Sequence, residues 1–294
     1  MRYALSTCWL PGEDGAAIAD KAIELGFDAL ELGYVTTDDQ LVGFRSRIGQ
    51  IGFDSVHAFC PAPIGAPSGH PELYQICSDS PDTRALAHIC LRRSFKCAAE
   101  FGAKVVVFHA AYVYAQSAVR SFLLGERRIE IPTAAERKRR RERGLQTLDV
   151  FKREFEKLAP ELEKLGLVLA LENLPRFEGF PNVEEAETLM KDLAGAPVAL
   201  WFDTGHARIR ETRTWDAPAK EVAECLIPWT RGMHLNDVVD VRDDHFAPGK
   251  GKVDFAALKP LAERDGVLHV FEPHPGVTAE DLRAGLALMR GTWG

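Results

Sequence analysis

Eight short apolar segments alternate with longer helical patterns along the chain, and this alternation limits the possible folds more than any other feature. The segment from Lys104 to His109 is rich in Val and follows Gly102, as expected of a strand that is buried on both faces. Because a helical pattern separates each segment from the next, the strands are predicted to run parallel. We predict strands at 3–6, 29–32, 55–59, 104–109, 167–172, 198–203, 232–235 and 267–272.

Several helix boundaries can also be predicted from the sequence. Thr133 and Glu136 have the spacing of a capping box, and Asn182 opens another helix in the same way. We expect the helix that begins at Thr133 to end or kink near Pro160, and a later helix to cover 255–264. Eight strand–helix units close into a barrel more naturally than into an open sheet. The sequence therefore predicts an α/β fold, a single-domain (β/α)8 TIM barrel over residues 1–294.

The composition is that of an ordinary globular chain, with 46% hydrophobic residues and a net charge of −7. The six cysteines are scattered without a CxxC pair, which is typical of free thiols in a reducing cytosol. No apolar run is long enough to span a bilayer, and the N-terminus reads as a short strand rather than a signal peptide. We therefore expect a cytoplasmic protein without a membrane partner.

One basic stretch bears on nucleic-acid binding. It comprises Arg127-Arg128 and the run at 137–141, and it could grip phosphates. Glu136 and Glu142 flank the run at 137–141, which favours a solvated helix face instead. The net charge is also acidic, whereas nucleic-acid-binding proteins usually carry an excess of basic residues. We therefore expect no nucleic-acid partner.

Ionisable residues gather at the C-terminal ends of the predicted strands, where (β/α)8 barrels carry their active sites. Carboxylates and imidazoles are costly there unless something pairs them, and a divalent cation does so directly. Three carboxylates and one imidazole would suit Mn, Co, Mg or Zn. We predict that Glu172, Asp203, His234 and Glu272 bind one such metal ion. Additional metal ligands or groups around the metal site are expected among His57, His109, His206, Asp243 and His245.

Four residues are predicted to contact a substrate. His206 lies three residues after Asp203, so it could turn to a substrate or to a second metal. Trp9 could stack on a sugar ring or pack under a loop, and Glu31 could bond a hydroxyl or pair with a lysine. Lys250, between two glycines, could also reach the substrate. The loops at 61–80 and 112–132 are expected to act as lids because they lie on the metal's side of the barrel.

These strand-end motifs resemble those of the xylose isomerase-like barrel superfamily, specifically its sugar phosphate isomerase/epimerase group. The resemblance rests on Leu171-Glu172-Asn173-Leu174-Pro175, Phe202-Asp203-Thr204-Gly205-His206-Ala207, His234-Leu235-Asn236-Asp237, the stretch from Asp243 to Gly251, and Glu272. It implies that Glu172 and Glu272 act as acid and base as well as metal ligands, and that His206 contacts the sugar. We therefore predict a metal-dependent isomerase or epimerase that acts on a small sugar or polyol ketone through an enediolate.

The superfamily also contains endonuclease IV-type enzymes, which cleave abasic DNA with three zinc ions held by nine residues. The chain offers a residue for each position: the four core residues and the five around them. The segments after His57 and Glu172 depart from the nuclease pattern. A multi-zinc phosphodiesterase therefore stays as an alternative, together with a related dehydratase or lyase and a non-catalytic sugar-binding barrel. The oligomeric state and the particular sugar are left open.

Overall fold

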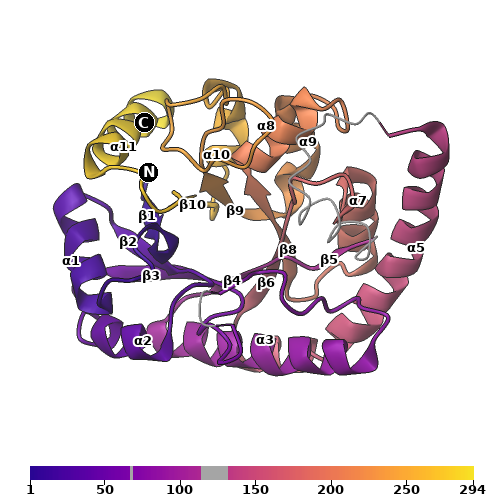
Figure 1. Cartoon of the computed structure of the whole chain (residues 1–294), viewed down its shortest axis with the longest axis horizontal. Helices are drawn as coiled ribbons and strands as arrows, with labels where there is room; N and C mark the ends of the chain where they lie inside the picture. Colours follow the sequence, from indigo (N-terminus) through magenta and orange to yellow (C-terminus); the bar gives the residue numbers. More distant parts are fainter. Residues whose placement is uncertain (67–68, 114–131) are drawn as a thin grey trace.

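The computed structural model describes residues 1–66, 69–113 and 132–294. Eight parallel strands form a closed barrel, with helices around it (Figure 1). The predicted (β/α)8 barrel is therefore confirmed. In order around the barrel the strands are β1 (Ala4–Ser6), β10 (Leu268–Phe271), β9 (Thr230–Leu235), β8 (Val198–Asp203), β6 (Val168–Glu172), β4 (Val105–Phe108), β3 (Gly52–His57) and β2 (Ala29–Leu32).

Local sequence signals position the helices that join these strands. Thr133 and Asn182 form the two predicted capping boxes, and Gly26 ends the first helix in the left-handed conformation with φ of 88°. The α-helices are α1 (Gly15–Leu25), α2 (Asp38–Arg45), α3 (Pro81–Phe101), α5 (Ala134–Glu156), α6 (Ala159–Leu165), α7 (Val183–Asp192), α8 (Thr204–Thr212), α9 (Ala219–Leu226), α10 (Lys259–Ala262) and α11 (Ala279–Trp293). Short 3-10 turns lie at Thr7–Trp9, Ile227–Trp229 and Ala256–Leu258.

Two of the predicted helices are divided in the structure. The helix that begins after Thr133 ends at Glu156, and α6 starts anew at Ala159 with Pro160 in its first turn. Proline lacks the N–H that would continue the first helix, so the predicted interruption near Pro160 is confirmed. The prediction of one continuous helix over 255–264 was wrong. A 3-10 turn precedes the four-residue α10, and Pro260 stands in the first turn of α10.

A second, two-stranded sheet was not predicted. β5 (Ala111–Tyr112) pairs antiparallel with β7 (Gly179–Phe180), and it ties the chain that leaves β4 to the chain that leaves β6. Strands of two residues are too short to give a periodic signal in the sequence. No helix in the described parts of the chain is long and apolar enough to cross a membrane.

The inside of the barrel is filled by one large indole among small and β-branched side chains. Trp201 is only 1% exposed and packs with Ala4, Ala29, Val105, Val107, Ala170 and Val270. A Cβ atom added at Gly232, on the neighbouring strand β9, would lie 2.1 Å from Cζ3 of Trp201. The Trp201 ring is 5.1 Å from the ring of His234, centroid to centroid. The indole therefore forms a packed floor beneath the strand-end residues.

Candidate metal centre

Four barrel strands bring the predicted metal ligands together. Glu172 ends β6, Asp203 ends β8, His234 lies in β9, and Glu272 directly follows β10. All four are at most 4% exposed. One potential ligand atom from each lies within 4.8 Å of those from the others. We call these residues the four-residue centre.

The imidazole of His234 stands between the carboxylates of this centre. Its Nδ1 is 3.4 Å from Oε1 of Glu172, 3.3 Å from Oε2 of Glu272 and 3.8 Å from Oδ2 of Asp203. Both carboxylate oxygens of Glu172 and Nδ1 of His234 are buried without a well-formed hydrogen bond in the described structure. Buried polar atoms without partners are costly, and a divalent cation would satisfy all of them. The residues therefore fit an ion that prefers oxygen ligands with one nitrogen.

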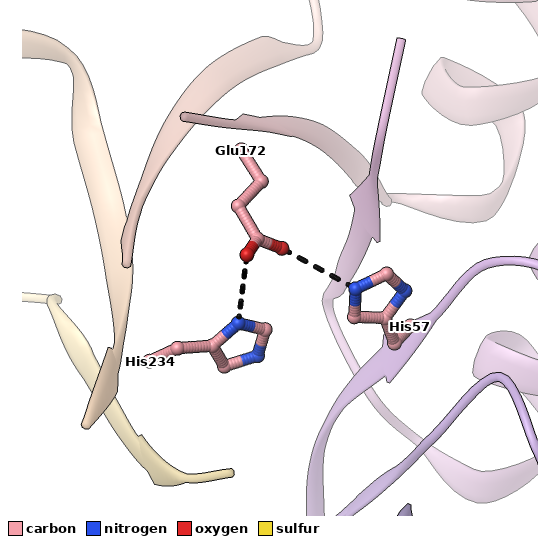
Figure 2. A group of neighbouring side chains, drawn as sticks. All are labelled: His57, Glu172 and His234. Carbon is pink, nitrogen blue, oxygen red and sulfur yellow. Dashed lines mark ion pairs between the residues drawn. The ribbon is translucent and has the colours of Figure 1, made fainter. Parts of the chain in front are cut away.

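Glu172 also connects the four-residue centre to the histidines around it. Figure 2 shows its two oxygens directed at His234 and His57, and the second oxygen is 3.3 Å from Nε2 of His57. The same oxygen is 3.2 Å from Nε2 of His109. The first oxygen also lies 3.3 Å from Nδ1 of His206. Glu172 is thus the residue on which the strand-end cluster converges.

A second group lies on the other side of Asp203. Ligand atoms of Asp203, His206 and His245 all lie within 4.8 Å of one another. Asp243 adds a carboxylate, with Oδ1 at 3.4 Å from Nε2 of His206 and 3.0 Å from Nε2 of His245. The Asp243 side chain is 40% exposed, so this group is nearer to solvent than the four-residue centre. The structure therefore brings all nine sequence-predicted ligand candidates into one cluster.

The turn after β8 explains how Asp203 and His206 reach the same site. Asp203 caps α8, and its Oδ1 accepts the backbone N–H of His206 at 2.7 Å. Its other oxygen accepts a hydrogen bond from Nδ2 of Asn236 at 2.6 Å. Nδ1 of His206 lies 2.8 Å from the carbonyl oxygen of Asn173, which holds the ring in place. Three neighbouring strand ends thereby fix the orientation of this turn.

Asp237 closes the loop that carries Asp243 and His245. Its carboxylate accepts four backbone N–H groups, from Val238, Gly249, Gly251 and Val253, at 2.7–3.0 Å. A Cβ at position 251 would lie 2.4 Å from Asp237 Oδ1, so glycine is required for this close approach. We call this arrangement the Asp237 clamp. It gives the two loop residues a rigid base.

The surroundings shift the pKa values of the two predicted acid/base glutamates in opposite directions. Burial raises the pKa of Glu172, but the nearby His234 and His109 outweigh it and hold the pKa well below its usual range. Burial also raises the pKa of Glu272, and here the net shift stays upward because the Glu172 charge adds to it against His234 and His245. No Lys or Arg nitrogen in the described residues lies within 4.0 Å of the Glu172, Asp203 or Glu272 carboxylates. Among the described residues, the ion-pair partners within 4.0 Å of these carboxylates are imidazoles.

The residues predicted to bind substrate lie in different surroundings. Trp9 is buried, and its indole N–H donates to the carbonyl of Val277 at 2.7 Å. This agrees with the predicted alternative that Trp9 packs under a loop. Glu31 is fully buried against His234. Lys250 is half exposed and pairs with Asp281 at the start of α11. His206 belongs to the second group and Glu31 contacts the four-residue centre, and substrate contact by all four residues stays a prediction.

Two residues of the cluster were missed by the sequence analysis. Glu72, in the predicted lid at 61–80, lies 3.4 Å from Nδ1 of His109 and accepts a hydrogen bond from the Tyr112 hydroxyl. His274 stacks on His245, with ring centroids 4.3 Å apart. His274 follows Glu272 by two residues, so its place at a strand end was a usable signal. Nothing in the sequence around Glu72 points to the site. Most of the other predicted lid, 114–131 of 112–132, lies outside the described residues.

Comparison with protein families identifies the class to which this barrel belongs. Residues 19–290 match the family described as xylose isomerase-like TIM barrel. The match covers most of the chain, and the closed barrel with its strand-end cluster agrees with it. The chain therefore belongs to the xylose isomerase-like TIM barrel family. No curated protein sequence matches the chain significantly.

Solved structures with the same fold include several sugar epimerases. A D-tagatose 3-epimerase-like protein has 22% identity and a TM-score of 0.69, with 100% of both chains covered. The 3-keto-D-glucoside 4-epimerase from E. coli has 16% identity and a TM-score of 0.70, with 99% of both chains covered. A Thermus thermophilus protein, studied after soaking with ZnCl2, has 22% identity and a TM-score of 0.62, with 99% of this chain and 98% of that chain covered. At these identities the likeness establishes the shared fold.

Proposed function

We propose that this protein is a divalent-metal-dependent isomerase or epimerase of a small sugar or polyol ketone. The observation that supports it best is the four-residue centre, with buried ligand atoms of Glu172 and His234 that lack hydrogen bonds. The sugar epimerases among the structures with this fold favour a sugar substrate. A metal bound at the centre would polarise the carbonyl and a neighbouring hydroxyl of the substrate.

The two glutamates would carry the proton. Glu172 has a lowered pKa and is suited to remove the proton from the carbon next to the carbonyl. Glu272 has a raised pKa and is suited to deliver a proton. Because they come from β6 and β10, on different sides of the barrel, they would act on opposite faces of the enediolate. Return of the proton to the same carbon gives epimerisation, and return to the next carbon gives isomerisation.

The test is hydrogen exchange on a panel of ketoses, aldoses and inositol-type ketones. Purified protein supplied with Mn²⁺, Co²⁺ or Zn²⁺ is incubated in D₂O, and deuterium at the α carbon is read by NMR. We expect exchange with at least one substrate, and its loss in Glu172→Gln and Glu272→Gln. The control is Glu263→Gln, an exposed carboxylate paired with Lys259 on the outside of the barrel. A protein that takes up none of these metals would refute the proposal.

A second function is favoured by the wider cluster. One oxygen of Glu172 lies beside His57 and His109 and the other lies beside His234, as expected of a carboxylate that could bridge two metals. Asp243, His206 and His245 offer ligands for a third ion. This arrangement supports a multi-zinc phosphodiesterase acting on abasic DNA. Three zinc ions per chain together with incision of an abasic oligonucleotide would favour it over the isomerase, and a single ion would count against it.

A further inference from the structure

Each of the five imidazoles among the predicted ligands has one ring nitrogen held by an acceptor and the other free to face the site. Backbone carbonyls hold Nδ1 of three of them at 2.8–2.9 Å: His57, His206 and His245. A carboxylate replaces the carbonyl at the other two, where Glu72 lies beside Nδ1 of His109 and Glu31 beside Nε2 of His234. His234 is therefore the one of these five that is held through Nε2 rather than Nδ1, which leaves its Nδ1 directed at the carboxylates of the four-residue centre.

The acceptor that holds Nε2 of His234 is Glu31, which reaches it across the barrel interior. It lies in β2, its residue is 0% exposed, and its two carboxylate oxygens are 3.1 and 3.2 Å from Nε2 of His234. Ser55, its register partner in β3, donates its hydroxyl to the same carboxylate at 2.7 Å. In the described structure no Lys or Arg nitrogen lies within 4.0 Å of Glu31. A buried carboxylate so placed has His234 as its main partner.

The chemistry of this contact determines which nitrogen of His234 can bind a cation. A carboxylate that has lost its proton only accepts hydrogen bonds, so Nε2 keeps its proton and Nδ1 is the nitrogen that gives up a proton to present a lone pair to a cation. Nδ1 is the atom that faces Glu172, Asp203 and Glu272 and that lacks a hydrogen bond of its own. A carboxylate behind a ligating imidazole also increases the basicity of the ligand nitrogen.

We propose that Glu31 is a positioning residue for the four-residue centre. It accepts the Nε2–H of His234, fixes the ring as the Nε2–H tautomer, and thereby raises the affinity of the centre for a divalent cation. The proposal rests on the metal site of the proposed function and assigns Glu31 a role other than substrate contact. Loss of such a carboxylate typically weakens metal binding about 10- to 100-fold.

The test compares zinc affinity, measured by chelator competition, in the wild-type chain and two variants. Glu31→Gln keeps the size of the side chain and removes its charge. Glu185→Gln is the matched control, because Glu185 is equally a buried glutamate but pairs with Arg140 away from the cluster. We expect Glu31→Gln to bind zinc about 10- to 100-fold more weakly, and Glu185→Gln to lose stability while keeping its zinc affinity.

A second measurement applies to the wild-type protein alone. With ¹⁵N-labelled histidine, long-range ¹H–¹⁵N spectra of the zinc-loaded protein should show the His234 proton on Nε2. A proton on Nδ1, or a folded Glu31→Gln variant with zinc affinity within about threefold of wild type, would overturn the role of Glu31. Failure of the wild type to bind zinc would overturn both this role and the proposed function. Tight binding that is indifferent to Glu31 would overturn the role alone.

Discussion

Gly232→Ala tests whether the packed interior of the barrel supports the four-residue centre. The new Cβ would lie 2.1, 2.4 and 2.6 Å from three atoms of the Trp201 six-membered ring. Atoms cannot approach so closely, and the indole is 1% exposed inside a closed barrel, so the ring has little free space into which to move. Overpacking of this kind costs about 1–3 kcal/mol, and we expect the upper end, about 3 kcal/mol. The displaced ring would also press on His234 and weaken zinc binding.

Urea unfolding followed by circular dichroism measures the free energy, and chelator competition measures the zinc affinity. Gly291→Ala is the control, because Gly291 lies in α11 with no atom within 4 Å of an added Cβ. This control should be neutral or more stable by up to about 1 kcal/mol. Adding Trp201→Phe to Gly232→Ala should recover part of the loss, since the clashing atoms are removed. A Gly232→Ala variant within about 0.5 kcal/mol of wild type would refute the packing argument.

Three further results are expected. Arg140→Met should lower the free energy of unfolding by about 3–5 kcal/mol, because it leaves the buried Glu185 carboxylate unpaired. The double variant Arg140→Met/Glu185→Leu should restore much of this loss. A much smaller loss in Arg140→Met alone would contradict this expectation. Zinc at 100 times its Kd should raise the free energy of unfolding by about 2.7 kcal/mol, reversibly with a chelator, and an unchanged melting temperature would argue against a native-state site. The pKa of His234 is raised well above its usual value: burial opposes the shift, and the charges of Glu272, Glu31 and Glu172 outweigh burial. Metal uptake near neutral pH should therefore release a proton, and zinc affinity should increase as the pH rises; calorimetry in two buffers that shows no proton release would contradict this.

The barrel and its strand-end residues could be predicted because their signals are local. Strand, helix and cap patterns lie within short windows, and the C-terminal ends of parallel strands meet at one face whatever the loops do. Asp203 and His206 share one turn, so their proximity followed from a spacing of three residues. Eight correctly assigned strands were therefore enough to predict where the cluster forms.

Contacts across the closed barrel could not be predicted in this way. Glu31 and His234 are 203 residues apart, and their contact depends on the register of strands β1 and β10, which stand between β2 and β9. From the sequence, Glu31 is expected to bond a hydroxyl or pair with a lysine, whereas its carboxylate lies against the ring of His234. Trp201 is similar: an indole in a strand does not reveal that glycine and alanine on other strands leave room for it.

In the Asp237 clamp, the residues that hold the loop in place differ from the residues that the loop brings to the site. Four backbone N–H groups on one carboxylate hold the base of the loop, while Asp243 and His245 lie in the span between the clamped residues. Changes between Val239 and Asp244 can thus alter the chemistry at the mouth without releasing the anchors that join the loop to the barrel. Exchange of this short span would therefore change the side chains beside His206 and His245 while the backbone anchors on Asp237 stay in place.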